Sequence, residues 1–227
     1  MKKKSLTIAA SVLTANFLSL KNELQALQTA GINWIHFDIM DHHFVPNLSF
    51  GPKILSDICQ FSANLNIDCH FMVKITTTTV MEYCQPFMIN PQVKNITFHY
   101  EALTPNQLQE FLNWKNDSFK KGLAINPDTN IANIYQYLPL LDTVLIMSVQ
   151  PGAGGQLFLT STLTKIESLV KVAIDYPHLT IAVDGGINDI TAAACIGAGA
   201  NFLVAGSYLL NSTNNIKMQV DKLTNNG

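Results

Sequence analysis

The chain repeats one pattern eight times: a short apolar run rich in β-branched residues, then a longer run with helical periodicity. Runs that are apolar throughout are typical of strands covered on both faces, as in parallel sheets. They lie at residues 7–13, 34–40, 67–73, 95–100, 122–126, 143–149, 179–185 and 201–207. Eight strands, each followed by a helix, in 227 residues predict a compact (β/α)8 TIM barrel, with residues 1–227 as one domain.

The intervening runs carry apolar residues at i, i+3 and i+4, which is typical of amphipathic helices packed on a sheet. The clearest extends from Leu18 to Ala30 and stops at Gly31, a common helix-ending residue. The others fall at 52–61, 78–88, 106–114, 131–138, 163–174, 189–196 and 215–223. A doubly wound open sheet is the alternative, but no G-x-G-x-x-G motif follows the first strand.

The N-terminus has two interpretations. Residues 1–4, Met-Lys-Lys-Lys, and the apolar stretch after them have the layout of a short signal peptide. We favour a first strand at Leu6–Leu13, because hydroxyl residues interrupt the stretch and the barrel needs that strand. No apolar run approaches the ~18–20 residues of a membrane span. Four cysteines without C-x-x-C spacing indicate free thiols, and we expect a cytoplasmic protein without membrane partners.

The charge pattern limits the possible partners. Charged residues make up 13% of the chain, the net charge is −2, and all 14 basic residues are lysines. Without a basic stripe, nucleic-acid binding is not expected. Without arginine, a substrate phosphate has to be held by backbone amides or lysine.

Chemistry-bearing side chains fall near the ends of the predicted strands. His36 and Asp38 share one face of their strand, because residues i and i+2 do so. His70 and Asp184 occupy equivalent depths in two other strands. A lone buried histidine is usually a hydrogen-bonded core residue, and an aspartate at a strand end often caps the next helix. The coincidence on three strands favours an N2O2 site for one divalent metal ion: Zn, Fe, Mn or Co.

Four further histidines are weighed separately. His42 and His43 could enlarge the metal site, but we favour a loop with one structural histidine and one exposed histidine. His99 is a candidate for the lining of the barrel mouth, and His178 is expected on the surface.

Glycine clusters follow the last three predicted strands. They are Gly152 with Gly154–Gly155, Gly185–Gly186, and Gly206 before Ser207. Glycine lets the backbone approach an anion closely, and the loops after strands seven and eight of such barrels often bind phosphate. These clusters predict a phosphate site built from backbone amides.

At these residues the chain resembles the ribulose-phosphate 3-epimerase family. The strings that carry the resemblance are WIHFDIMDHHFVPNLSFGP (34–52), DCHFMV (68–73), TFHYEA (97–102), LAINPDT (123–129), VLIMSVQPGAGGQLF (144–158), AVDGGIN (182–188) and GANFLVAGSYL (199–209). They span nearly the whole chain in the order of the family. The resemblance implies a metal-containing barrel of the ribulose-phosphate-binding type, which interconverts D-ribulose 5-phosphate and D-xylulose 5-phosphate.

The resemblance also implies roles for individual residues. The metal ligands would be His36, Asp38, His70 and Asp184. The two aspartates would also be the acid and base that move the C3 proton through a 2,3-enediolate. His70 would also contact the substrate. The other substrate-contacting residues would be Ser11, Met40, Met72, Met147, Gly152, Ala153, Gly154, Gly155, Gly185, Gly186, Gly206 and Ser207. The implied partners are a small sugar phosphate and further copies of the chain in a homo-oligomer.

The chain departs from the family pattern at a few positions. Ala10 replaces the usual proline, Asn16 an aspartate, His42 a glycine and Ala153 a phenylalanine, while Gln150 replaces an asparagine. None of these changes removes a proposed ligand, so they bear on substrate preference and rate. The alternatives are an allulose-6-phosphate 3-epimerase, which acts on a hexulose phosphate, and a non-catalytic sugar-phosphate-binding barrel.

Overall fold

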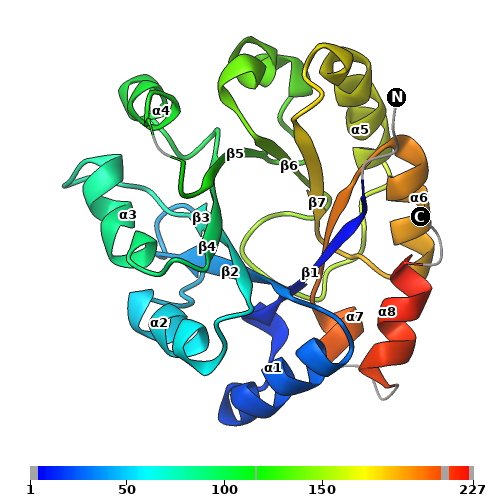
Figure 1. The fold of residues 1–227 in the computed structure, drawn as a ribbon. Helices are drawn as coiled ribbons and strands as arrows, with labels where there is room; N and C mark the ends of the chain where they lie inside the picture. Colours follow the sequence, from blue (N-terminus) through cyan, green and yellow to red (C-terminus); the bar gives the residue numbers. More distant parts are fainter. Residues whose placement is uncertain (1–4, 116, 211–214, 225–227) are drawn as a thin grey trace.

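The computed structural model describes residues 5–115, 117–210 and 215–224, and these form a closed parallel barrel (Figure 1). Each strand pairs with the next in sequence, and the last pairs with the first. The strands are β1 (Thr7–Ser11), β2 (Trp34–Met40), β3 (Asn66–Met72), β4 (Val93–His99), β5 (Lys120–Ile125), β6 (Thr143–Met147), β7 (Thr180–Asp184) and β8 (Phe202–Ala205). The predicted (β/α)8 barrel is confirmed.

Helices surround the barrel and cover its outer face (Figure 1). The α-helices are α1 (Leu20–Thr29), α2 (Pro52–Phe61), α3 (Val80–Met88), α4 (Pro105–Leu112), α5 (Thr162–Val172), α6 (Asp189–Ala198), α7 (Ser207–Leu210) and α8 (Ile216–Thr224). Short 3₁₀ segments are η1 (Val12–Thr14), η2 (Phe17–Ser19), η3 (Ile131–Leu140) and η4 (Ala173–Asp175). Among the described residues, no helix is long and apolar enough to cross a membrane.

Local sequence signals explain where several helices begin. Thr79 accepts a hydrogen bond from the backbone of Glu82, whose side chain accepts one from the backbone of Thr79. The same reciprocal capping box joins Thr104 and Gln107 at the start of α4. Each box satisfies backbone N–H groups that the first helical turn leaves without partners.

Three expectations from the sequence need correction. The segment 131–138 is helical, but it belongs to the 3₁₀ segment η3 and not to an α-helix. Its buried residues Ile131 and Ile134 lie three residues apart, which matches the three residues per turn of a 3₁₀-helix. Pro139 lacks the N–H donor that an α-helix would need there. Several strands end before their apolar runs do, because the chain turns toward the barrel mouth, as at Ser148. The short helix α7 was not expected.

The N-terminal apolar stretch forms β1, as favoured over a signal peptide; residues 1–4 lie outside the described residues. The four cysteines are free, as expected, and all four are buried.

The apolar core has two main parts. Outward-facing strand residues pack against the helices, with Phe37, Phe71 and Phe98 fully buried in this layer. Inward-facing residues fill the barrel, and they are Ala9, Ala124, Leu145, Met147, Val149, Ala182, Phe202 and Val204. The inward-facing histidine and aspartate side chains of β2, β3 and β7 lie toward the carboxyl ends of the strands, where such barrels place their active sites.

Candidate functional site

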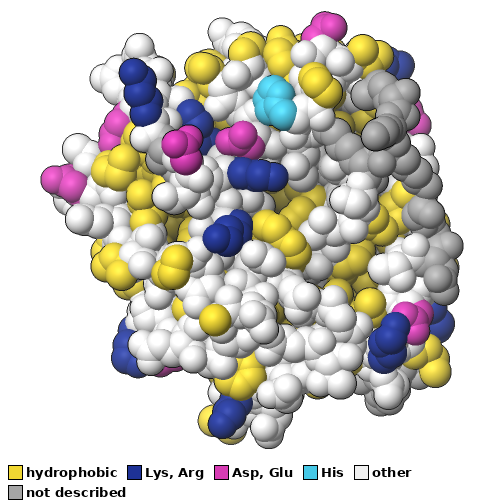
Figure 2. Space-filling model, in the orientation of Figure 1, with side chains coloured by type: hydrophobic (Ala, Val, Ile, Leu, Met, Phe, Trp, Pro, Cys, Tyr) yellow, Lys and Arg dark blue, Asp and Glu magenta, His cyan; other side chains and the backbone are white. Residues whose placement is uncertain are grey.

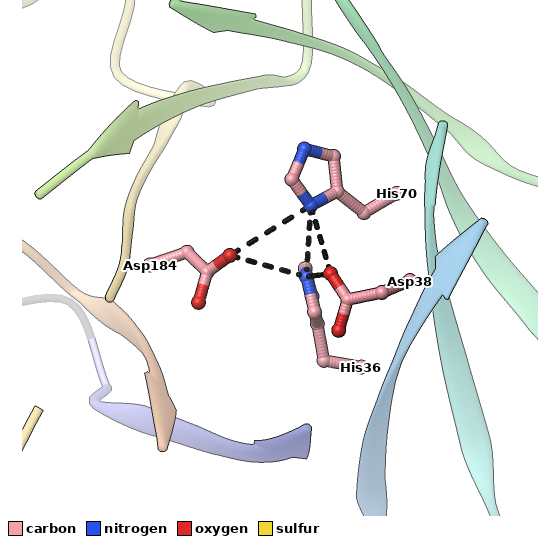
Figure 3. A group of neighbouring side chains, drawn as sticks. All are labelled: His36, Asp38, His70 and Asp184. Atoms are coloured by element: carbon pink, nitrogen blue, oxygen red, sulfur yellow. Dashed lines mark hydrogen bonds and ion pairs between the residues drawn. The ribbon is translucent and has the colours of Figure 1, made fainter. Parts of the chain in front are cut away.

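Strand register brings the predicted ligands together. In the β2–β3 pair, Asp38 lies opposite His70, and His36 lies opposite Asp68. Ser11 of β1 lies opposite His36 on the other side of β2. Because alternate residues share a face, these side chains all point into the barrel. Asp184, at the end of β7, reaches the same point from the opposite side (Figure 3).

Four ligand atoms meet within 4.8 Å of one another, one each from His36, Asp38, His70 and Asp184. His36 Nε2 lies 3.1 Å from His70 Nδ1 and 3.2 Å from Asp38 Oδ1, and His70 Nδ1 also lies 3.2 Å from Asp38 Oδ1. Asp184 Oδ2 lies 3.6 Å from His36 Nε2 and 3.7 Å from His70 Nδ1. A tetrahedron with bonds of about 2.0–2.2 Å has edges of roughly 3.3–3.6 Å. The donor atoms and their spacing therefore fit a divalent metal ion.

Different surroundings push the pKa values of the two carboxyl groups apart. Burial raises the pKa of Asp184 to about 7. Burial also opposes ionisation of Asp38, but the charge of His36 and hydrogen bonds from His36 and His70 outweigh it, so the pKa of Asp38 lies well below its usual range. Two carboxyl groups with separated pKa values are a common arrangement for acid and base roles.

The two imidazoles of the site also differ. Burial disfavours protonation of both rings. At His36 the Asp38 and Asp68 carboxylates overcome this effect and raise its pKa, whereas the pKa of His70 stays below its usual value. Burial lowers the pKa of the neighbouring His99 to about 4, so that ring is neutral at pH 7.

Hydrogen bonds position the reacting side chains from outside the cluster. Ser11 Oγ donates to Asp38 Oδ2 at 2.7 Å, and Ser49 Oγ donates to the carbonyl oxygen of Asp38 at 2.5 Å. Ser148 Oγ lies 2.9 Å from the carbonyl oxygen of Asp184 and 2.6 Å from that of Gly185. The backbone of Asp38 is thus held by the loop after its own strand, β2, and the backbone of Asp184 by the residue that follows the neighbouring strand β6.

A cavity opens above the cluster. Every predicted substrate-contacting residue except His70 lines it, and the methionines at its inner end are buried. Thr14, Val149, Gln156 and Ile187, among others, line it as well, and sequence reasoning did not select them. The roles assigned to the lining residues stay predictions.

Loops after three strands meet at the outer part of this cavity. Gly186 has φ +61°, and a Cβ atom there would lie 2.7 Å from the backbone nitrogen of Phe158. The loop after β7 can therefore lie against the loop after β6 only because this position has no side chain. Asn47 Nδ2 donates to the carbonyl oxygen of Gly152 at 2.9 Å and ties the loop after β2 to the loop after β6.

The other histidines lie outside the metal cluster. His42 and His43 are both exposed, and His43 Nδ1 donates a hydrogen bond to the carbonyl oxygen of Asp41 within the loop at 2.8 Å. His42 has φ +62°, in the left-handed region of the backbone. His178 is exposed, as predicted. His99 does not line the cavity; it is fully buried behind His70.

Comparison with known proteins adds to this geometry. The model of the ribulose-phosphate 3 epimerase family matches residues 7–210. The ribulose-phosphate 3-epimerase of Chlamydia muridarum is 38% identical over 213 residues, which cover 92% of this chain and 90% of that protein. This chain belongs to the ribulose-phosphate 3-epimerase family. The family member from Buchnera aphidicola (Acyrthosiphon pisum) is 37% identical over 220 residues, or 95% of this chain and 92% of the relative. The chain is thus an enzyme of the epimerase class.

Solved structures with low sequence identity share the fold of this family member. The crystal structure of KGPDC from Streptococcus mutans is 11% identical, with a TM-score of 0.67 over 98% of this chain and 97% of the other. A 3-hexulose-6-phosphate synthase is 12% identical, with a TM-score of 0.65 over 97% of this chain and 99% of the other. At these identities the likeness concerns the barrel alone.

Proposed function

We propose that this enzyme interconverts D-ribulose 5-phosphate and D-xylulose 5-phosphate by moving the proton at C3. The observation that carries the proposal is the meeting of Asp38 and Asp184 from opposite sides of the barrel, beneath one cavity. Inverting C3 requires a proton to leave one face of the carbon and to return on the other. Two carboxyl groups from opposite walls provide one group for each face.

One divalent metal ion, Zn, Fe, Mn or Co, is the proposed cofactor, and His36, Asp38, His70 and Asp184 would hold it. When bound, such an ion acts as a Lewis acid that favours negative charge on neighbouring substrate oxygens. Two imidazole nitrogens and two carboxylate oxygens are ligands that these ions accept.

The two aspartates divide the proton transfers. Asp38, as a carboxylate, can take the C3 proton on its side, while Asp184, in its protonated form, can deliver one on the other side. The roles exchange in the reverse direction, with a 2,3-enediolate between the two transfers. Positioned acids and bases contribute about 10²–10⁴-fold in rate.

The rest of the cavity protects and orients the substrate. Met40, Met72 and Met147 are buried around the carboxylates and offer no proton donor to the enediolate. The glycine loops after β6, β7 and β8 present backbone amides for the phosphate. We place the enzyme in the cytoplasm, since its four cysteines are free thiols.

Turnover in heavy water tests the two-base scheme. The product should carry solvent deuterium at C3, and Asp38→Asn and Asp184→Asn should each abolish epimerisation. Metal content is measured in both variants, because each residue is also a proposed ligand. A product that retains its original C3 hydrogen, in a single turnover with metal fully bound, would contradict the scheme.

A panel of ketose phosphates tests the substrate. We expect D-ribulose 5-phosphate to have a higher kcat/KM than D-allulose 6-phosphate. The reverse order would assign the chain to hexulose phosphates, and turnover of neither sugar with metal bound would favour a binding protein.

A further inference from the structure

The two histidines at the metal cluster present different ring nitrogens to it. His36 presents Nε2, and His70 presents Nδ1. A neutral imidazole has one N–H and one lone pair, and only the nitrogen with the lone pair can bind a metal ion. Each ring therefore has to carry its proton on the nitrogen that faces away from the cluster.

A carboxylate fulfils this requirement at His36. Its Nδ1 lies 2.7 Å from Oδ2 of Asp68, which accepts the hydrogen bond and so keeps a proton on Nδ1 when Nε2 gives its lone pair to a metal ion. Asp68 lies two residues before His70 on β3, so the two side chains share a face of the strand.

At His70, the outer nitrogen contacts a third imidazole, and none of the described carboxylates contacts it. His70 Nε2 lies 2.8 Å from His99 Nε2, and both rings are fully buried. One nitrogen of this pair must donate and the other must accept. The contact alone does not decide which, and hence does not decide whether His70 Nδ1 can bind the metal ion.

Glu101 decides the direction. His99 Nδ1 is buried, makes no hydrogen bond to another described side chain, and lies 3.4 Å from Glu101 Oε2. Glu101 Oε1 accepts a hydrogen bond from the backbone N–H of Asn126 at 2.8 Å and another from the hydroxyl of Thr129. The carboxylate is thus fixed with its free oxygen toward His99. The side chain is 21% exposed, so solvent helps to keep it charged.

We propose that Glu101 and His99 are positioning residues that set the tautomer of His70. Glu101 holds the proton of His99 on Nδ1, so His99 Nε2 accepts the proton of His70 Nε2, and the lone pair of His70 Nδ1 faces the cluster. The inference rests on the proposed function only in taking His70 Nδ1 as a metal ligand.

The isosteric variant Glu101→Gln tests the direction of this chain. The N–H of Asn126 requires an oxygen at its partner, so the amide NH₂ of the glutamine faces His99. His99 Nδ1 then becomes an acceptor, Nε2 carries the proton and donates to His70, and His70 is protonated on Nδ1. Glu110→Gln is the matched control, because Glu110 also accepts two backbone N–H bonds, from Val80 and Met81, but lies on α4 outside the barrel.

The measurement is ¹⁵N NMR of the imidazole nitrogens in the metal-free protein at neutral pH, with His70 assigned by comparison with His70→Ala. We expect Nε2–H at His70 in the wild type and in Glu110→Gln, and Nδ1–H in Glu101→Gln. Zn²⁺ affinity, measured by competition with a chelator, should fall about 10–100-fold in Glu101→Gln and stay unchanged in the control.

Three results would overturn the proposal. The first is a wild-type His70 that is protonated on Nδ1 or on both nitrogens, a result that needs no variant to fold. The second is an unchanged His70 tautomer in Glu101→Gln, even if Zn²⁺ binds more weakly. In that case the negative charge of Glu101 would affect Zn²⁺ binding directly and not through the tautomers of His99 and His70. The third is an altered tautomer with unchanged affinity. A wild type that binds no divalent metal would refute the proposed cofactor, while the tautomer is still read in the metal-free protein.

Discussion

Single side chains in this protein differ in ionisation because their surroundings differ, although their types are the same. Asp38 and Asp184 are both carboxylates of one cluster, yet the first accepts hydrogen bonds from Ser11 and the histidines, whereas the second is raised in pKa mainly by burial. In the metal-free protein these surroundings leave one site charged and the other protonated. The consequence can be measured as a pH dependence of folding.

We expect Asp184→Asn to stabilise the metal-free protein at and above pH 7. A folded pKa of about 7 exceeds the usual value of 3.8, so the folded state holds a proton that the unfolded state has lost between these values. Stability contributed by Asp184 is therefore full below pH 4 and is lost as the pH rises to about 7. With about 1.4 kcal/mol per pKa unit, the advantage of the variant is on the order of a few kcal/mol.

Urea unfolding in the presence of a chelator, from pH 4 to pH 8, measures this difference. Asp57→Asn is the control, because Asp57 is half exposed on α2 and pairs with Lys53. A stability difference between wild type and Asp184→Asn that does not change with pH would show that Asp184 is not perturbed.

At the scale of elements, periodicity and turn residues predicted the strands and most helices. The segment 131–138 was misjudged because apolar spacing alone does not separate 3₁₀ from α-helix. Of the site, the four cluster residues could be chosen because they are histidines and aspartates at equivalent depths in otherwise apolar strands. Asp68 shares a strand face with His70 and could have been found, whereas the role of Glu101 depends on contacts with the next strand's loop.

One element carries a tight contact that a substitution can exploit. Gly122 of β5 faces Thr97 of β4, and a Cβ atom at position 122 would collide with the threonine side chain. We expect Gly122→Ala to destabilise the protein by about 1–3 kcal/mol through overpacking. The double variant Gly122→Ala with Thr97→Ala should recover part of this loss in denaturant unfolding. Additive effects would show that the contact is not the cause.

The link between two loops makes a second prediction at this scale. Asn47→Ala removes the hydrogen bond from Asn47 Nδ2 to the carbonyl oxygen of Gly152 and frees the loop that follows β6. A hydrogen bond of about 0.5–1.5 kcal/mol corresponds to a roughly 2–12-fold higher KM for the sugar phosphate. Steady-state kinetics on the metal-loaded enzyme measure it. Asn133→Ala is the control, because Asn133 is an exposed residue of η3. An equal rise in KM in both variants would exclude the hydrogen bond between the two loops as the cause.

For the whole molecule, the surface sets limits on partners. On the face shown in Figure 2, lysine and acidic side chains are interspersed and form no continuous basic surface. This agrees with the absence of arginine and with the expectation of a small-molecule partner. Homo-oligomerisation stays a prediction, which sedimentation of the purified protein would test.

The cavity predicts a strong dependence on the substrate's phosphate. The glycine loops and the carboxylates line the same cavity, so binding energy at the phosphate would help to position a carbon that the phosphate does not touch. Two charge-assisted hydrogen bonds of about 1.5 kcal/mol each correspond to a roughly 100-fold difference in kcat/KM. We expect kcat/KM for D-ribulose to be lower than for its 5-phosphate by at least about this factor. Equal values would place the phosphate outside these loops.

The closure of the ring by β1 and β8 ties activity to complete synthesis. Three cluster residues arise early in the chain, on β2 and β3, whereas Asp184 arrives with β7 and the partner strand of β1 arrives only with β8. A chain that terminates before residue 184 keeps the β1–β2 pairing but leaves the other edge of β1 unpaired, and it lacks the second carboxylate. Premature termination products therefore hold only part of the site, and the closed barrel with all four cluster residues exists only once β8 has been synthesised.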